Sequence, residues 1–247
     1  MNRSNRLQTL ALASLALLAN LTQPAFGQLD KILGGIGKAA GSNSAGSSDT
    51  KVASGLKEAL TIGTTNAVKL TGTADGYFRN ELIKIALPPR LRTAEKGLRL
   101  VGAGAQADEF VLGMNRAAEK AAPEASKYFK AAILSMNFTD AKGILTGGDT
   151  AASDFFKAKT SGQLTTAFRP HVEAAMSQLE ITKQFEVLMA GLKKIPFMKT
   201  ESFDINDYVV QQAINGLFVM VGQEEKKIRR DPAAQVTSLL KDVFGRR

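Results

Sequence analysis

The sequence predicts an all-α protein: a single multi-helix, bundle-like domain of about eight to ten helices that follows a signal peptide and a flexible linker. Three observations support this fold class: apolar residues recur at helical spacing from Val52 onward, a Gly/Ser-rich tract precedes them, and the chain has no cysteine. Without disulfides the domain depends on a hydrophobic core, which about 200 residues are enough to form.

The N-terminus has the order of features that is typical of a secretory signal peptide. Arg3 and Arg6 make a positive start, residues 7–21 are mainly apolar, and small residues precede a cut after Gly27. We therefore expect residues 1–27 to be removed and the mature protein to be periplasmic or secreted. No later apolar run approaches the roughly 20 residues that a membrane span needs.

A flexible linker is expected between the signal peptide and the domain. Residues 34–50 contain five glycines and four serines, a composition that buries little apolar surface. We place the linker at residues 28–51 and the helical domain at residues 52–247.

Apolar residues recur on one helical face in most of the domain. The stripes run through residues 110–121, 125–136, 164–179, 181–195, 210–228 and 236–244. Pro123 and Asp204 are expected to begin helices, and Pro170 is expected to break or kink one.

Two shorter stretches carry their own predictions. Residues 82–89, "LIKIALPP", read as an extended segment after the turn-like "TADGYF". Residues 217–221, "LFVMV", are apolar throughout, and their flanks continue a helical period. They predict the middle of a central, fully buried helix.

The first candidate site is Gly147-Gly148-Asp149-Thr150, which lies between two apolar runs. As a helix joint, a left-handed glycine would close one helix, and Asp149 or Thr150 would cap the next. As a functional site, the free N–H groups of the second helix would bind an anion, or Asp149 would carry a proton. The G-x-x-x-x-G-K-S/T pattern of a phosphate-binding loop is absent.

The second candidate site is Asn115, Arg116 and Glu119 in "MNRAAEKAAPEA", residues 114–125. Their spacing makes them neighbours on a helix surface, beside several alanines. They form either the edge of a helix-packing face or a polar patch that presents itself to a ligand.

Several chemistries are not expected. His171 is the only histidine and no cysteine is present, so we expect no metal site, no cofactor and no identifiable catalytic residue. Residues 224–232, "EEKKIRRDP", read as a solvated helix end, and they lack the interleaved aromatics of a nucleic-acid site. Loss of Arg3 and Arg6 leaves +7 of the formal charge of +9, which favours weak attraction to anionic envelope surfaces.

Six strings, taken in order, resemble a known family. They are "GLKEALTIGTTNAV" (55–68), "MNRAAEKAAPEA" (114–125), "GILTGGDTAASDFF" (143–156), "KKIPF" (193–197), "DYVVQQAINGLF" (207–218) and "EEKKIRRDPAA" (224–234). Together they resemble an uncharacterised family of exported bacterial proteins, catalogued as domain of unknown function forty-one ninety-seven, over about residues 52–245. The resemblance implies export and brings no activity, cofactor or site residue.

Three functional hypotheses follow. The leading one is a non-catalytic protein of the cell envelope that binds an unknown envelope protein or ligand. The second is a hydrolase-type enzyme in which acids near Asp149, such as Asp140 and Asp154, transfer protons. The third is a carrier of a lipid or other apolar molecule, for which the 13 phenylalanines and seven methionines would line a cavity.

Overall fold

The structure is a computed structural model that describes residues 44–100, 102, 104–192, 203–231, 234, 235, 237 and 238. From Gly46 on, these residues belong to one compact unit. The expected signal peptide, the linker up to residue 43, and nearly all of the helix expected at residues 236–244 lie outside the described residues.

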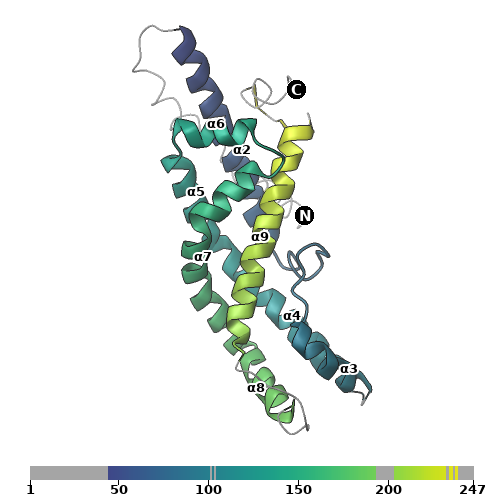
Figure 1. The fold of residues 1–247 in the computed structure, drawn as a ribbon. Helices are drawn as coiled ribbons and strands as arrows, with labels where there is room; N and C mark the ends of the chain where they lie inside the picture. The colour runs from purple at the N-terminus through teal and green to yellow at the C-terminus, as the bar shows by residue number, and fades with distance from the viewer. Residues whose placement is uncertain are drawn as a thin grey trace, which may run out of the picture. The chain divides into compact units, whose positions relative to one another are not determined.

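The described part of the chain is helical and contains no strand, which confirms the all-α class (Figure 1). The α-helices are α2 (Ser44–Thr71), α3 (Arg92–Leu100), α4 (Gly104–Ala121), α5 (Ala125–Ser135), α6 (Phe138–Thr146), α7 (Ala151–Gln178), α8 (Ile181–Leu192) and α9 (Ile205–Arg230). Two 3-10 turns, η2 (Pro89–Leu91) and η3 (Ala122–Glu124), precede α3 and α5. The expected range was about eight to ten α-helices, and the described residues do not reach its upper part.

Helix α2 begins earlier than the composition indicated. It starts at Ser44, so the end of the segment expected as a linker is helical. Extending an existing helix costs far less than nucleating one, and the buried part of α2, which begins at Gly55, supplies the packed helix to extend.

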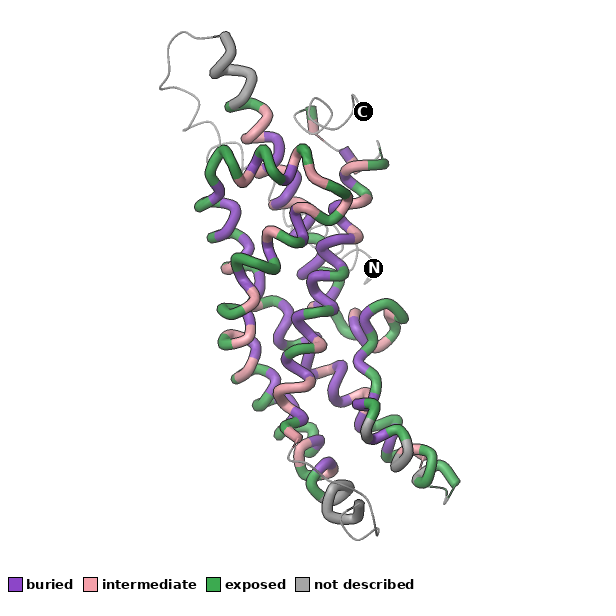
Figure 2. The backbone as a smooth tube through the Cα atoms, in the orientation of Figure 1, coloured by how far each residue is buried: buried purple, intermediate pink, exposed green. Residues whose placement is uncertain are grey.

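Helices α7 and α9 form the centre of the unit and run antiparallel, side by side (Figure 1). Helix α4 packs against both, and α5 packs against α7. Buried positions follow the inner faces of these helices (Figure 2). Phe129 of α5 lies at the centre of the packing, with its ring 5.1 Å from that of Phe156 and 6.2 Å from that of Phe218.

Helix α7 continues through Pro170 to Gln178, so the expected break does not occur. Buried residues lie on both sides of the proline, with Leu164 and Phe168 before it and Val172 after it, all at 0% exposure. Continuous packing of this face outweighs the roughly 3 kcal/mol that an interior proline costs.

The centre of α9 is less uniformly buried than the sequence predicts. Leu217, Phe218, Met220 and Val221 are buried, but Val219 is 41% exposed. The helix therefore presents one side to solvent even within its fully apolar segment.

The connector between α2 and α3, residues 72–88, matches only part of the extended segment predicted at residues 82–89: residues 81–83 form a turn, residues 84–88 belong to no helix or turn, and Pro89 begins η2. Ile83, Ile85 and Leu87 are buried, whereas the alternating residues Leu82, Lys84 and Ala86 are exposed. This alternation is that of a strand, although no neighbouring strand pairs with it in the described residues.

The close approach of α9 to this connector requires a glycine. A Cβ atom at Gly216 would lie 2.7 Å from Tyr77 Cε1 and 3.1 Å from Ile83 Cβ. Tyr77 cannot easily move away, because it is 0% exposed and its hydroxyl donates to the Ala213 carbonyl at 2.6 Å.

We expect Gly216→Ala to lower the free energy of unfolding by about 1–3 kcal/mol, since the added methyl overpacks this contact. The matched control is Gly143→Ala in α6, where a Cβ would meet nothing within 4 Å; there alanine should stabilise by up to about 1 kcal/mol. Urea unfolding followed by circular dichroism measures both. Equal effects at the two positions would contradict the close approach.

Candidate functional site

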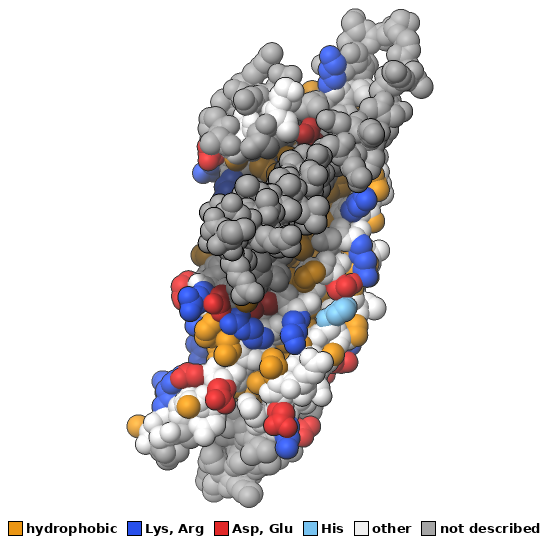
Figure 3. Space-filling model, turned by 180° about the vertical axis from the view of Figure 1, so that it is seen from behind, with side chains coloured by type: hydrophobic (Ala, Val, Ile, Leu, Met, Phe, Trp, Pro, Cys, Tyr) orange, Lys and Arg blue, Asp and Glu red, His pale blue; other side chains and the backbone are white. Residues whose placement is uncertain are grey.

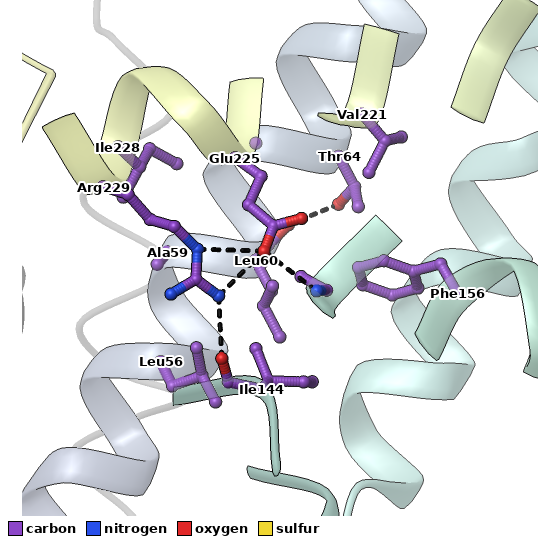
Figure 4. Close-up of a pocket in the computed structure, with 12 residues that line it drawn as sticks. Leu56, Ala59, Leu60, Thr64, Ile144, Phe156, Val221, Glu225, Ile228 and Arg229 are labelled. Atoms are coloured by element: carbon purple, nitrogen blue, oxygen red, sulfur yellow. Dashed lines mark hydrogen bonds and ion pairs between the residues drawn. The ribbon is translucent and has the colours of Figure 1, made fainter. Parts of the chain in front are cut away.

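A pocket lies between α2, the α6–α7 joint and α9 (Figure 4). The empty space within it is about 350 Å³, a figure that includes open solvent at its mouth. Its walls are mainly apolar, with Thr64, Glu225 and Arg229 as the polar contributors. The apolar lining comes from Leu56, Ala59, Leu60, Gly63, Ile144, Ala152, Phe156, Val221 and Ile228.

Glu225 of α9 caps the N-terminus of α7. Its carboxylate accepts the backbone N–H groups of Ala152 and Ser153, each at 2.9 Å, and the Ser153 hydroxyl at 3.0 Å. The first N–H groups of a helix have no acceptor within the helix, so they need partners from elsewhere. Here a different helix supplies the carboxylate, which also interacts favourably with the positive end of the α7 dipole.

Arg229, one turn further along α9, completes the arrangement. Its Nε and Nη2 donate to Glu225 Oε1 at 3.0 and 2.8 Å, and Nη2 also donates to the Ile144 carbonyl at 2.7 Å. The two side chains are only 7% and 6% exposed. The Glu225–Arg229 pair therefore joins α9 to the start of α7 and to the end of α6.

This arrangement limits what the pocket can do chemically. The Glu225 carboxylate already accepts from two backbone groups, a hydroxyl and a guanidinium. The carboxylate acts as a hydrogen-bond acceptor that stabilises the α6–α7 joint. Its oxygens are already engaged, which disfavours proton transfer with a substrate. The remaining lining favours an apolar ligand group.

The candidates Asp149 and Thr150 lie at the same joint, outside the pocket lining. Asp149 pairs with Arg230 at the surface, where the side chains are 39% and 68% exposed. Thr150 occupies the N-cap position of α7 without making a side-chain capping bond, and its hydroxyl contacts Asp154 at 3.2 Å. The expectation that Asp149 or Thr150 caps α7 is wrong, because Glu225 occupies that role.

The glycines of the joint also differ from expectation. Gly147 has φ −77°, and neither it nor Gly148 is among the residues with positive φ. A Cβ at Gly147 would lie 2.6 Å from Ala151 Cβ and 2.8 Å from the Gly143 carbonyl oxygen. Gly147 is therefore needed for the close approach of α6 to α7, not for a left-handed backbone.

The second group of candidates faces the chain's own backbone. Asn115 Oδ1 accepts the Ile85 N–H at 2.8 Å, and its Nδ2 donates to the Ile85 carbonyl at 2.9 Å, so this amide replaces a strand partner. Glu119 Oε1 accepts the N–H groups of Tyr77 and Phe78 at 3.1 and 3.2 Å. Asn115 is 0% exposed and Glu119 4%.

Arg116 completes this second group. It contacts Glu119 Oε2 through Nη1 at 2.6 Å and Asp75 Oδ1 through Nη2 at 2.5 Å. Asp75 has φ 68°, a left-handed conformation at the turn that begins the connector. We name Asn115, Arg116 and Glu119 the connector clamp, because all three hold residues 72–88 against α4.

Tyr77 links the connector clamp to α9. Its N–H donates to Glu119, and its hydroxyl donates to the Ala213 carbonyl. Burial, and secondarily the Glu119 charge, raise the pKa of Tyr77. The phenol is therefore held neutral as a hydrogen-bond donor.

Glu224 and Glu225 differ from expectation, since residues 224–232 were predicted to be a solvated helix end. Both are buried, at 5% and 7% exposure. Glu224 accepts Asn66 Nδ2 at 3.0 Å and pairs with Lys227 at 2.5 Å. The signal was available: residues 217, 221, 224, 225 and 228 lie on one face of a helix, so the two glutamates follow the core stripe.

The remaining features are simpler. His171 is exposed and lies 3.5 Å from Glu124. Within the part of the chain that the structure describes, no three His, Asp or Glu side chains group as metal ligands would. None of the described helices combines the length and the apolar character needed to cross a bilayer.

The family model described as "Protein of unknown function (DUF4197)" matches residues 46–245. The chain belongs to this family. The match confirms the resemblance seen in the sequence, and the DUF4197 region includes both the connector clamp and the Glu225–Arg229 pair. Comparison with curated proteins gives no match, and comparison with solved structures gives none either.

We expect Glu225→Ala to lower the free energy of unfolding by about 3–5 kcal/mol, because it removes the carboxylate from a buried pair and uncaps α7. Asp149→Ala, which breaks the exposed pair at the same joint, should cost less than about 1 kcal/mol. Urea unfolding measures both, and Arg229→Ala with the double variant gives the coupling energy. A Glu225→Ala effect no larger than that of Asp149→Ala would contradict the assignment.

Proposed function

We propose that the protein is an exported, non-catalytic binding protein of the cell envelope. One observation carries this proposal: the interior polar groups Asn115, Glu119 and Glu225 bind the chain's own backbone, while the pocket beside Glu225 has mainly apolar walls. Such an interior suits a stable binding scaffold. A general acid or base would instead need a carboxyl that a substrate can reach.

The hydrolase alternative receives less support from the acids it invokes. Asp140 accepts the Asn137 N–H in a capping box, Asp149 pairs with Arg230, and Asp154 contacts Thr150. Each is engaged locally at a helix end. This pattern favours structural roles for the three aspartates.

For the carrier alternative, the pocket beside Glu225 is the candidate binding site. The pocket's mainly apolar lining suits one small apolar group, such as an aliphatic side chain or the end of an acyl chain. The ligand would be held by burial of apolar surface, since few polar atoms line the pocket.

The envelope location rests on the N-terminal segment, whose charged start, apolar stretch and small residues before Gln28 are those of a secretory signal. The unknown partner is then another envelope protein or an envelope ligand. The proposal involves no cofactor and no nucleic acid.

The test is to recover the protein from the periplasmic fraction or the medium of an expressing bacterium and to sequence its N-terminus. We expect the chain to begin at Gln28. The same material, assayed on ester, phosphate, glycoside and peptide substrates, should match the Asp149→Ala variant in every assay, with neither above background.

Two results would overturn this proposal. Hydrolysis of one substrate class by the wild type, lost in Asp149→Ala, would establish the enzyme alternative. An uncleaved chain found only in the cytoplasm would remove the envelope location.

A further inference from the structure

The corner where α5 ends and α6 begins exposes two large apolar side chains. Leu134 is 67% exposed and Phe138 is 56% exposed, although most large apolar residues of the described chain are buried. Figure 2 colours most residues at this corner as exposed. Neither the pocket nor the connector clamp uses these residues.

Exposed lysines accompany them on the same helix faces. Lys127, Lys130 and Leu134 are spaced by three and four residues along α5, so they share its outer side. Lys142 lies four residues after Phe138 in α6 and is also exposed. We name Lys127, Lys130, Leu134, Phe138 and Lys142 the α5–α6 face. In Figure 3, basic and hydrophobic side chains follow one another along the edge that α5 forms.

Acidic side chains are outnumbered by lysines on this face. Between Lys127 and Lys142 the only acid is Asp140, which accepts the Asn137 N–H at 3.1 Å within the capping box of α6. Glu124, just before the stretch, pairs with Lys127 at 2.7 Å and lies near His171. Three lysines thus stand against two acids, each of which is engaged locally, and the α5–α6 face keeps a positive excess.

We propose that the α5–α6 face docks the protein on an anionic lipid surface. Protruding apolar side chains enter the boundary between headgroups and acyl chains, while flanking lysines bind the negative headgroups. The positive charge of the α5–α6 face favours an anionic lipid surface over a second copy of the chain, because two copies would bring the same lysines together. The inference does not depend on what the pocket binds.

The absence of tryptophan from the chain provides a direct test. In the full chain, Phe138→Trp introduces a single tryptophan on the α5–α6 face, and Leu82→Trp introduces one at a position on the connector that is 67% exposed. Each variant is titrated with vesicles of phosphatidylglycerol and phosphatidylcholine, and with vesicles of phosphatidylcholine alone.

We expect the emission of the Phe138→Trp variant to shift to the blue with the anionic vesicles only, and the shift to be reversed by high salt. The emission of the Leu82→Trp variant should not respond. Lys130→Glu with Lys142→Glu, added to Phe138→Trp, should weaken apparent binding by about tenfold or more. The reporter also distinguishes two modes of vesicle binding. Binding through the apolar N-terminal segment alone would leave the indole at position 138 in water, and its emission would not shift.

Three results would overturn the inference. They are an unchanged spectrum of the Phe138→Trp variant with anionic vesicles, an equal shift with neutral vesicles, and a blue shift without vesicles that grows with protein concentration. The last would show that a second copy of the chain covers the face.

Discussion

Every buried backbone N–H and carbonyl needs a hydrogen-bond partner, and this requirement governs how the DUF4197 domain is assembled. The helices meet it internally, but the extended connector and the buried ends of α6 and α7 cannot. Asn115 and Glu119 of α4 supply partners to the connector, while Glu225 and Arg229 of α9 supply them to the α6–α7 joint. Two regular helices thereby hold the irregular parts of the chain in place.

The same arrangement connects structure with proposed function. Because Glu225 and Arg229 bind each other and the backbone, they form a fixed wall beside an apolar pocket. A wall of this kind suits binding better than proton transfer. None of the lysines and apolar side chains of the α5–α6 face lines the pocket, so the two proposals can be tested separately.

Local patterns made most of the helices predictable from the sequence. The apolar stripes indicated α4, α5, α7, α8 and α9, and Asp204 caps α9 as expected, accepting the N–H groups of Asn206 and Asp207. Long-range partners were not predictable: Glu225 caps a helix 73 positions earlier in the chain, and Asn115 binds a backbone 30 positions earlier. The sequence identified Asn115, Arg116 and Glu119 as a group, but which backbone they bind depends on the tertiary fold.

Native-state hydrogen exchange tests the central claim most directly. The amides of Ala152 and Ser153, in the first turn of α7, and those of Tyr77 and Ile85 in the connector should exchange only through global unfolding. The reference is the N–H of Asn206 at the exposed start of α9, which donates to the Asp204 carboxylate. It should exchange much faster. Exchange of Ala152 and Ile85 at the rate of Asn206 would show that the carboxylate and amide contacts of α9 and α4 do not hold the fold together.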